Sequence, residues 1–356
     1  MKELNIQLSE RKLRVLSAII KSYIQTGEPV GSKAVVDLLD NSVSSATIRN
    51  DMAELAQLGL IEQPHTSAGR IPSQAGYRLY IDKLMTRYPL SDEEKKIIDD
   101  MLSDKDDPEK LLENASAALA ELTNMAGLTT TPAAEEATIT HVELIPAGKR
   151  NAVIVLLSSN GIMKSKLCRS GCNITSDLIG MFYNIVQNSI VGQNICDITL
   201  PYIQTLAVSL GEHAFDMIPL LMSVYEASRE AGESELCLKG QANLLLHPEY
   251  GGTRARELFE FLAQRDKMLS LLRRHKGGVS VVLGSEANQH ALDGSSLLVA
   301  NYRIGGYESG ALGVLGPDRM NYAKLIPSLE YFAMRVGKLL SDVLGEGDIC
   351  DKDGSS

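Results

Sequence analysis

Apolar residues recur at every third or fourth position through most of the first 85 residues, which is the spacing of helices that bury one face. In a predicted helix over residues 9–26, Leu13, Leu16 and Ile20 follow this spacing, and Gly27 is placed to end the helix in a left-handed conformation. The same pattern predicts three further helices, over residues 32–39, 45–58 and 73–85.

The pattern changes between the third and fourth of these helices. Residues 60–63 predict a short strand, and residues 70–71 can return as its partner. The segment between them, residues 64–69, is polar and begins and ends with residues that break regular structure, so it predicts a loop. Three helices followed by a strand, a loop and a strand are typical of a winged helix, in which one helix enters a DNA groove and the loop contacts the adjacent backbone.

The rest of the chain alternates between two periodicities. Residues 88–107 form an acidic connector, which we expect to contain one short helix, and residues 174–232 return to helical spacing. Strands are predicted over residues 137–146, 151–158, 161–168, 278–283, 297–303 and 311–316, and helices over residues 108–125 and 322–343. Strands, then helices, then strands again predict an α+β domain interrupted by a mostly helical insert.

The third predicted helix is amphipathic, and its polar face suits a DNA groove. Ile48, Met52 and Leu55 fall on one side and form the expected buried seam. On the opposite side, Asn50 can pair with an adenine edge and Arg49 with a guanine or a phosphate, while the helix N-terminus can bind a phosphate. The same pattern also fits an ordinary solvated face, so this helix alone leaves both interpretations open.

The predicted loop favours the DNA interpretation. Its small and hydroxyl-bearing residues, among them Thr66 and Ser67, can approach a sugar–phosphate chain, and Arg70 supplies a cation at its end. Together with the order of the elements, this composition predicts a winged helix that binds DNA.

The net charge of −10 is compatible with DNA binding once it is divided along the chain. Residues 1–90 carry 11 Lys and Arg against 9 Asp and Glu, a net of +2, and the remainder carries 24 against 36, a net of −12. An acidic body limits indiscriminate binding to DNA, while a mildly basic head can still contact phosphates. The asymmetry permits nucleic-acid binding without demonstrating it.

Other classes of protein are disfavoured by what the sequence lacks. No apolar run is long enough to cross a membrane, and the N-terminus lacks the apolar stretch of a secretory signal. Five scattered cysteines argue against a disulfide framework and for a cytoplasmic protein. Nucleotide-binding, zinc-protease and serine-hydrolase motifs are absent, and the six histidines are dispersed. We therefore expect no enzyme, no cofactor, no metal site and no membrane partner.

Several stretches of the chain resemble the family of the heat-inducible transcription repressor HrcA. They are EPVGSKAV (28–35), SSATIRNDMAELAQLGLIEQPHTSAGRIPS (44–73), GYRLYIDKLM (76–85) and, more loosely, ITHVELIP (139–146). The resemblance implies a homodimer that binds an inverted-repeat operator in double-stranded DNA, represses chaperone operons and depends on the GroE chaperonin for activity. The residues that we expect to contact DNA are Lys33, Ser44, Ser45, Thr47, Arg49, Asn50, His65, Thr66, Ser67 and Arg70.

The resemblance also implies the domain organisation. It combines an N-terminal winged helix-turn-helix domain with a GAF-like α/β domain that carries an inserted dimerisation segment. The predicted limits are a winged-helix domain over 1–87, an acidic connector over 88–107, a GAF-like domain over 108–172 and 241–344, an insert over 173–240 and a disordered tail over 345–356. Within the insert, the apolar stretches 180–192 and 213–227 are expected to form the subunit interface.

Two functional hypotheses follow. In the first, the protein is a dimeric repressor whose body responds to protein-folding stress through the chaperonin. In the second, it is a small-molecule-gated transcriptional regulator whose GAF-like domain binds a metabolite. The sequence identifies no cofactor-binding residues that would separate the two.

Overall fold

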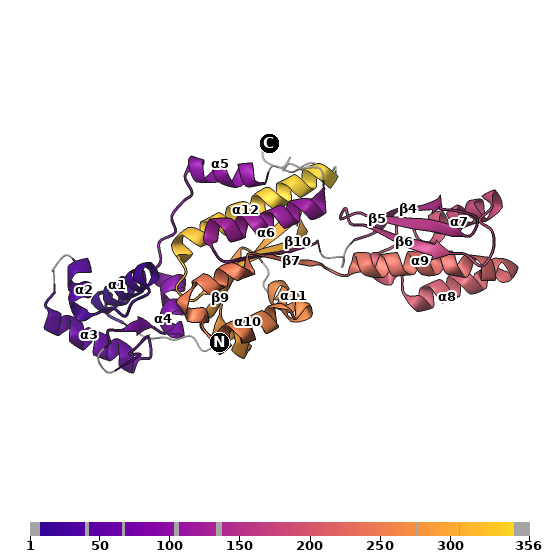
Figure 1. Ribbon diagram of the computed structural model, residues 1–356. Helices are drawn as coiled ribbons and strands as arrows, with labels where there is room; N and C mark the ends of the chain where they lie inside the picture. Colours follow the sequence, from indigo (N-terminus) through magenta and orange to yellow (C-terminus); the bar gives the residue numbers. More distant parts are fainter. Residues whose placement is uncertain are drawn as a thin grey trace.

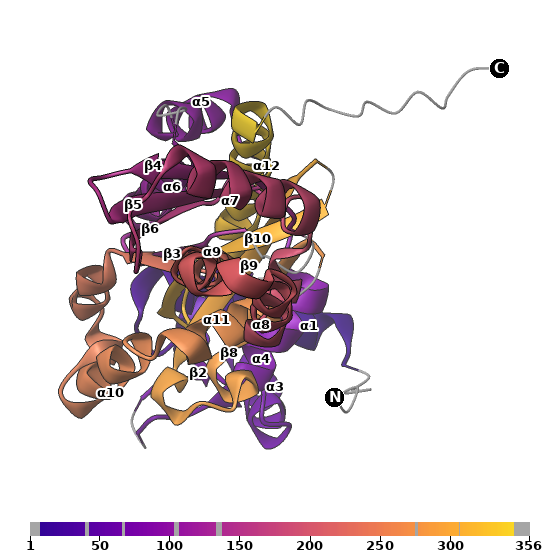
Figure 2. The same ribbon diagram turned by 90° about the vertical axis from the view of Figure 1, so that its right-hand side faces the viewer.

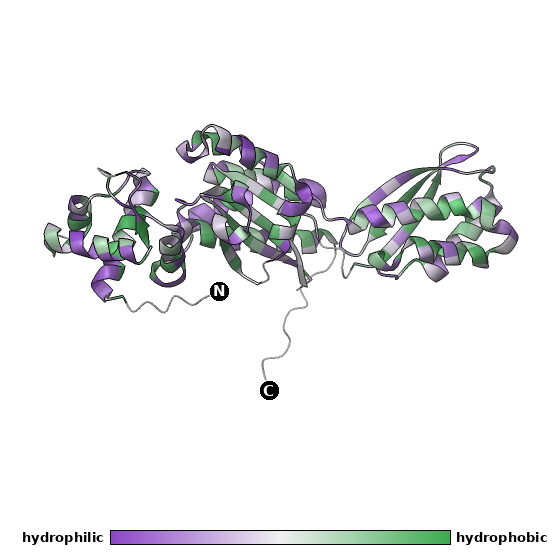
Figure 3. Cartoon of the chain, turned by 90° about the horizontal axis from the view of Figure 1, so that it is seen from below, coloured by the Kyte–Doolittle hydropathy of each residue, from purple (hydrophilic) through white to green (hydrophobic). Residues whose placement is uncertain are grey.

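The structure, a computed structural model of the chain, describes residues 8–39, 43–65, 68–102, 107–132, 137–274, 277–305 and 307–344. The predicted tail over 345–356 lies outside the described residues. The chain is arranged as a head, a body and an insert that follow one another along a line (Figure 1). Seen from below, apolar residues are distributed over all three parts, as expected where each part has a core (Figure 3).

The head is a winged helix, as predicted. Its elements are α1 (Glu10–Thr26), α2 (Ser32–Leu38), α3 (Ser45–Gln57), β1 (Ile61–Glu62), β2 (Ile71–Pro72), α4 (Gln74–Leu79) and the π-helical turn η1 (Tyr80–Leu84). Gly27 ends α1 with a φ of 69°, in the left-handed region expected from the sequence, and its N–H donates to the carbonyl of Tyr23. The short helix expected in the connector is α5 (Asp92–Met101), which begins with a capping box between Ser91 and Glu94.

The body is a five-stranded antiparallel sheet between two layers of helices. Its elements are α6 (Pro108–Thr123), β3 (Ala126–Thr130), β7 (Leu236–Lys239), η4 (Gln241–Leu246), η5 (Pro248–Tyr250), α10 (Thr253–Leu262), α11 (Arg265–Arg273), β8 (Val279–Leu283), η6 (Gly284–Ala287), η7 (His290–Leu292), β9 (Ser295–Ile304), β10 (Tyr307–Pro317) and α12 (Tyr322–Leu344). The strand order is β7-β3-β10-β9-β8. Figures 1 and 2 show α6 and α12 on one face of this sheet, with α10 and α11 on the other.

Alternation along the strands explains the two layers of the body. On β9, Leu298 and Ala300 belong to the core beneath α6 and α12, whereas Leu297 and Val299 belong to the core beneath α10 and α11. Because side chains alternate between the two faces of a strand, a strand buried on both faces must be apolar throughout. The α+β class predicted from the sequence is confirmed.

The insert has a sheet of its own. Its elements are β4 (Ile139–Pro146), β5 (Asn151–Ser158), β6 (Met163–Arg169), α7 (Ser176–Ser189), η2 (Ile195–Asp197), α8 (Leu200–Ser209), η3 (Gly211–His213) and α9 (Ala214–Gly232). The predicted limits assign residues 139–169 to the body, but in the structure they form a separate antiparallel sheet, β4-β5-β6, that shares a core with α7, α8 and α9. This arrangement favours an insert that begins near residue 137.

The insert leaves and rejoins the body at neighbouring points. The preceding strand β3 pairs with the following strand β7, with Thr130 opposite Leu236. One residue further out, the N–H of Thr131 donates to the carbonyl of Glu235 at 2.9 Å, and the N–H of Glu235 donates to Oγ1 of Thr131 at 2.7 Å. The two connecting segments therefore run side by side.

The head and the body share one continuous core. Tyr77 of α4 stacks edge-on against Tyr322 of α12, with ring centroids 6.1 Å apart. Around this contact, Nε2 of Gln74 donates to Oδ2 of Asp318 at 3.5 Å, and the Arg78 guanidinium pairs with Glu286. The Tyr77 hydroxyl is the one buried side-chain polar atom of the described residues that lacks a hydrogen-bond partner. The junction thus combines apolar packing with a few polar contacts.

Asp318 makes this junction sensitive to pH. Burial raises the pKa of Asp318 to about 6, although Ser296 and Gln74 donate hydrogen bonds to its carboxylate. A carboxyl group with a raised pKa in the folded state binds a proton there before it does so in the unfolded chain. The free energy of unfolding should therefore fall, by up to about 3 kcal/mol, as the pH rises from about 4 to about 6. Urea unfolding across this range should show that the wild type loses stability relative to Asp318→Asn as the pH rises.

Candidate nucleic-acid interface

The helix expected to enter DNA, α3, buries one side and exposes the other as predicted. Ile48, Met52 and Leu55 are at most 5% exposed, whereas Arg49 and Asn50 lie on the exposed side. Exposed positions of this helix also include Ala46 and Ala53, whose small side chains allow a close approach to a groove. The predicted amphipathic character of this helix is confirmed.

The N-terminus of α3 is capped by Ser44. Its Oγ accepts from the N–H of Thr47 at 3.2 Å and lies 2.9 Å from Oγ1 of the same residue. A capping side chain fixes where the helix begins and satisfies one of its free N–H groups. The hydroxyls of Ser44 and Thr47 are thus already paired with each other, but Ser44 remains exposed at the end of the helix.

Contacts between α2 and α3 position the predicted arginine. Oγ of Ser32 lies 3.3 Å from Oγ of Ser45, and Nε of Arg49 donates to the same Ser32 oxygen at 3.4 Å. Lys33, the next residue of α2, is exposed. The structure therefore brings Arg49, Ser45 and the start of α2 together, as a DNA-binding surface at the beginning of α3 requires.

An ion pair that the sequence pattern did not predict fixes α3 in the head. Nε and Nη2 of Arg11 donate to the two carboxylate oxygens of Asp51 at 2.7 and 2.9 Å, and Asp51 is only 1% exposed. The paired carboxylate raises the pKa of Arg11. At 100° per residue, Asp51 falls within about 40° of Leu55, on the edge of the buried seam. A charged residue at that position needs a partner, so the pattern contains the signal, although the partner lies 40 residues away.

The wing is tied to the turn between α1 and α2. Strands β1 and β2 pair with Ile61 opposite Pro72, and beyond them Arg70 pairs with Val30 through backbone hydrogen bonds of 2.8 and 2.9 Å. A Cβ on Gly69 would lie 2.6 Å from the Val30 backbone, so only glycine allows this approach. The base of the wing is thereby held against the helical part of the head.

Arg70 also bridges the base of the wing with its side chain. Its Nη1 donates to Oε1 of Gln63 at 2.7 Å, and Nε2 of Gln63 donates to the carbonyl of Ala68 at 3.1 Å. A guanidinium has five N–H donors, so this bond leaves others for a phosphate. His65 is exposed and its carbonyl accepts from the N–H of Ala68, while Thr66 and Ser67 lie outside the described residues.

In the described part of the chain, His, Cys, Asp and Glu do not gather in any group of three that could hold a metal ion. The helices of the same residues include none with the length and apolar character needed to cross a bilayer. The four cysteines that the structure describes are free thiols.

Comparisons with known proteins agree with this geometry. Residues 7–83 match the family model described as winged helix-turn-helix transcription repressor, HrcA DNA-binding. Residues 109–326 match the model described as HrcA protein C terminal domain. The first match covers the whole of α1 to α4, including α3 and the wing.

Individual relatives match over nearly their full lengths. The chain is 31% identical over 344 residues to the heat-inducible transcription repressor HrcA of Acetivibrio thermocellus, which covers 95% of this chain and 98% of that protein. It is 34% identical over 338 residues to the protein of the same name from Desulforudis audaxviator, covering 94% and 98%. A crystal structure of a protein described only as hypothetical is similar with a TM-score of 0.65 at 25% identity, covering 95% of this chain and 100% of the other.

Proposed function

The chain belongs to the HrcA family of heat-inducible transcription repressors, and from this premise we propose that it represses transcription by binding an inverted-repeat operator in double-stranded DNA. The exposed face of α3 carries the proposal, because it presents Arg49 and Asn50 behind a capped helix start. The major groove admits an α-helix, and both side chains have hydrogen-bonding groups that match base edges. The residues proposed to contact DNA are Lys33, Ser44, Ser45, Thr47, Arg49, Asn50, His65, Thr66, Ser67 and Arg70.

Operator binding by the full chain tests this proposal. Fluorescence anisotropy with an inverted-repeat duplex and with a scrambled duplex of equal length, at one salt concentration, should show a preference of about a thousandfold or more for the repeat. Equal affinity for the two duplexes would overturn it.

Arg49→Ala should weaken operator binding by about 1–3 kcal/mol and relax the preference at one base position, because an arginine paired with a guanine edge discriminates between bases. The measurement is a set of affinities for operators with single base changes. Ser32→Ala serves as the control, since it removes the 3.4 Å support of Arg49 but keeps the cation. If Arg49→Ala binds every operator as the wild type does, a role for Arg49 in operator binding is ruled out.

Arg70→Ala should weaken binding to all sequences alike and lower the slope of log affinity against log salt by about 1, because a phosphate contact releases a counterion. Gln63→Ala is the matched control. It removes the 2.7 Å hydrogen bond to Arg70 while leaving the charge in place, so its slope should stay at the wild-type value. An unchanged slope for Arg70→Ala would contradict the phosphate contact.

We further infer that the protein acts as a homodimer through the insert. The apolar stretches 180–192 and 213–227, expected at the interface, supply much of the insert's own core, including Phe182, Val186 and Met217, while Phe215 at 88% and Ile218 at 42% are exposed. The uncovered side of the insert sheet also carries exposed apolar residues, interspersed with the polar His141, Ser165 and Arg169. These apolar residues are Leu167 at 75%, Met163 at 62%, Ile145 at 48% and Leu157 at 39%.

The register gathers these exposed residues into one surface, which we call the insert sheet face. Leu157 lies opposite Met163, and Val153 lies between Ile145 and Leu167 on the neighbouring strands. Apolar residues clustered in this way mark an interaction surface, and an inverted repeat calls for a twofold partner. A second copy of the chain on this face supplies that partner.

The dependence on the GroE chaperonin is proposed from the family resemblance. We expect the chaperonin to raise the fraction of protein able to bind the operator, in the cytoplasm and after heat stress. Operator titrations of protein refolded from urea, with and without chaperonin, measure that fraction. Equal fractions in both would speak against chaperonin dependence.

A further inference from the structure

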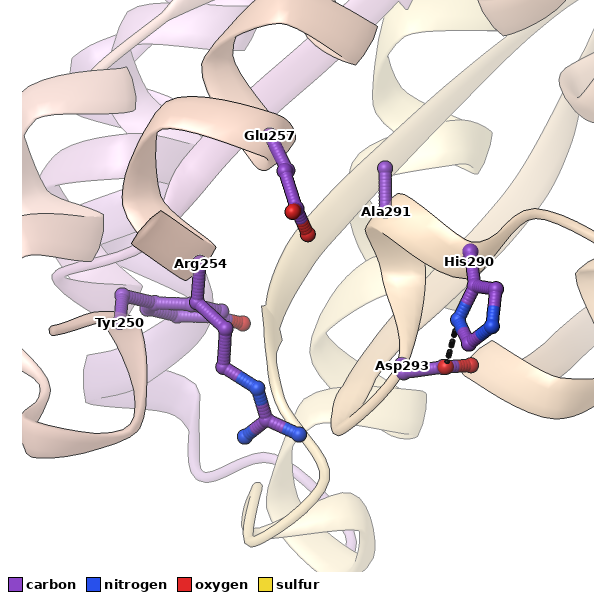
Figure 4. Close-up of a pocket in the computed structure, with 6 residues that line it drawn as sticks. All are labelled: Tyr250, Arg254, Glu257, His290, Ala291 and Asp293. Atoms are coloured by element: carbon purple, nitrogen blue, oxygen red, sulfur yellow. Dashed lines mark hydrogen bonds and ion pairs between the residues drawn. The ribbon is translucent and has the colours of Figure 1, made fainter. Parts of the chain in front are cut away.

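A cavity of about 230 Å³ lies on the body between α10 and the segment that precedes β9. Its lining residues are Tyr250, Arg254, Glu257, His290, Ala291 and Asp293 (Figure 4). At about 30 Å³ per molecule it has room for roughly seven waters. It is smaller than the 300–1,000 Å³ or so of pockets that enclose drug-sized ligands. The space suits a small metabolite.

Charges of both signs line this cavity. Arg254 and Glu257 come from α10, and Asp293 comes from the opposite wall (Figure 4). Neither Arg254 nor Glu257 forms an ion pair or a side-chain hydrogen bond with another residue that the structure describes. On the same helix, by contrast, Arg256 donates from its Nε to Glu260 at 2.7 Å. Asp293 is itself paired with His290 (Figure 4), so Arg254 and Glu257 carry the charges that are available to a ligand.

The start of α10 adds a further preference for an anion. Its N-cap is Gly252, whose missing side chain leaves the first turn without a side-chain acceptor. Free N–H groups and the helix dipole favour a negative group there. The guanidinium of Arg254 extends along the wall, so that a Cβ on Gly294 would lie 3.5 Å from its Nη1. Of this first turn, Arg254 lines the cavity, and its guanidinium is the group that a carboxylate would meet.

We propose that this cavity binds a small zwitterionic metabolite of the α-amino-acid class. Arg254 binds its carboxylate, and the carboxylate of Glu257 attracts its ammonium group. Charge-assisted hydrogen bonds of this kind are roughly twice as strong as neutral ones. A dianion is repelled by Glu257 and a diamine by Arg254, so the mixed lining selects a ligand that carries both charges.

The walls of the cavity also hold the head. Glu249, next to Tyr250, pairs with Arg319, whose guanidinium lies 3.4 Å from where a Cβ on Gly27 of α1 would be. On the other wall, the carbonyl of Gly294 accepts from the N–H of Asp318 at 3.1 Å, and Asp318 in turn accepts from Gln74. A ligand that draws the two walls together therefore acts on contacts that orient the winged helix. This coupling to operator binding rests on the proposed function, whereas the binding site itself does not.

Calorimetry on the full chain tests the site. The probes are the proteinogenic L-amino acids, one at a time, together with acetate, methylammonium and inorganic phosphate. At least one amino acid should bind once per chain, and Arg254→Ala and Glu257→Gln should each weaken it by about tenfold or more. Arg256→Ala and Glu260→Gln, on the same helix with the same charges, should leave binding unchanged.

Each other outcome overturns a stated part of the proposal. Binding of no amino acid, binding of acetate or phosphate as tight as that of any amino acid, or equal loss in the control variants removes the zwitterion site. An amino acid that binds without changing operator affinity removes the coupling and leaves the site. Failure of operator binding in every condition, with amino-acid binding intact, defeats the proposed function and not the site.

Discussion

Gly76→Ala is expected to destabilise the winged helix by about 3 kcal/mol or more and to abolish operator binding. A Cβ at this position of α4 would lie 2.1 Å from the carbonyl oxygen of Leu60 and 3.2 Å from its carbon. Leu60 is 1% exposed, and its carbonyl also accepts from the N–H of Ser73. Overpacking against side chains typically costs about 1–3 kcal/mol, and buried backbone gives way less easily. Circular dichroism in urea measures the loss.

Gly180→Ala is the matched control for this prediction. Gly180 lies in α7, where a Cβ would meet nothing within 4 Å. Alanine is favoured over glycine inside a helix by about 1 kcal/mol, so this variant should be slightly more stable than the wild type. Equal unfolding midpoints for Gly76→Ala and the wild type would mean that α4 does not pack on the end of β1 as described.

Leu167→Lys is expected to convert the proposed dimer into monomers and to weaken operator binding by about a hundredfold or more. The side chain is 75% exposed on the edge strand β6 of the insert sheet face, so a lysine there is tolerated in a monomer. In a dimer it places charge at an apolar contact, where an unpaired charge is costly. Two linked heads gain roughly 10²–10⁴ in affinity over one, and monomers lose that gain. Sedimentation and anisotropy measure the two effects.

Leu246→Lys is a control of equal exposure. Leu246 is also 75% exposed, but it lies on η4 of the body. Its substitution should leave both the oligomeric state and the operator affinity unchanged. If Leu167→Lys sediments as the wild type does, the insert sheet face is not the dimer contact.

The head could be predicted because its elements are set by neighbours in sequence. Three features of the head depend only on residues a few positions apart, and all three are found where expected. They are the helical spacing, the glycine at position 27 and the cap at Ser44. The ion pair between Arg11 and Asp51 was missed, since it depends on how two helices pack. The support of Arg49 by Ser32 and of Arg70 by Gln63 was missed for the same reason.

The body was harder to predict because the local sequence does not identify each strand or the sheet to which it belongs. Strand β3, AGLTT, is buried at every position, so it has no alternation to distinguish it from the end of a helix. Its Gly127 reflects packing, since a Cβ there would lie 2.1 Å from the carbonyl oxygen of Ser116 on α6. Strands β4 to β6 do show alternating buried and exposed positions, but this alternation does not indicate to which sheet a strand belongs. Their separate sheet depends on contacts with α7 to α9, which no local pattern contains.

The insert leaves and rejoins the body at neighbouring points, so it can be removed without disturbing the sheet of the body. Since Thr130 already faces Leu236 across β3 and β7, a tight turn joining these two strands would convert them into an ordinary hairpin and leave the five-stranded sheet complete. Evolution can therefore lengthen, exchange or delete the insert without changing the strand order of the body. Grafting it onto other antiparallel hairpins offers protein engineers the same freedom.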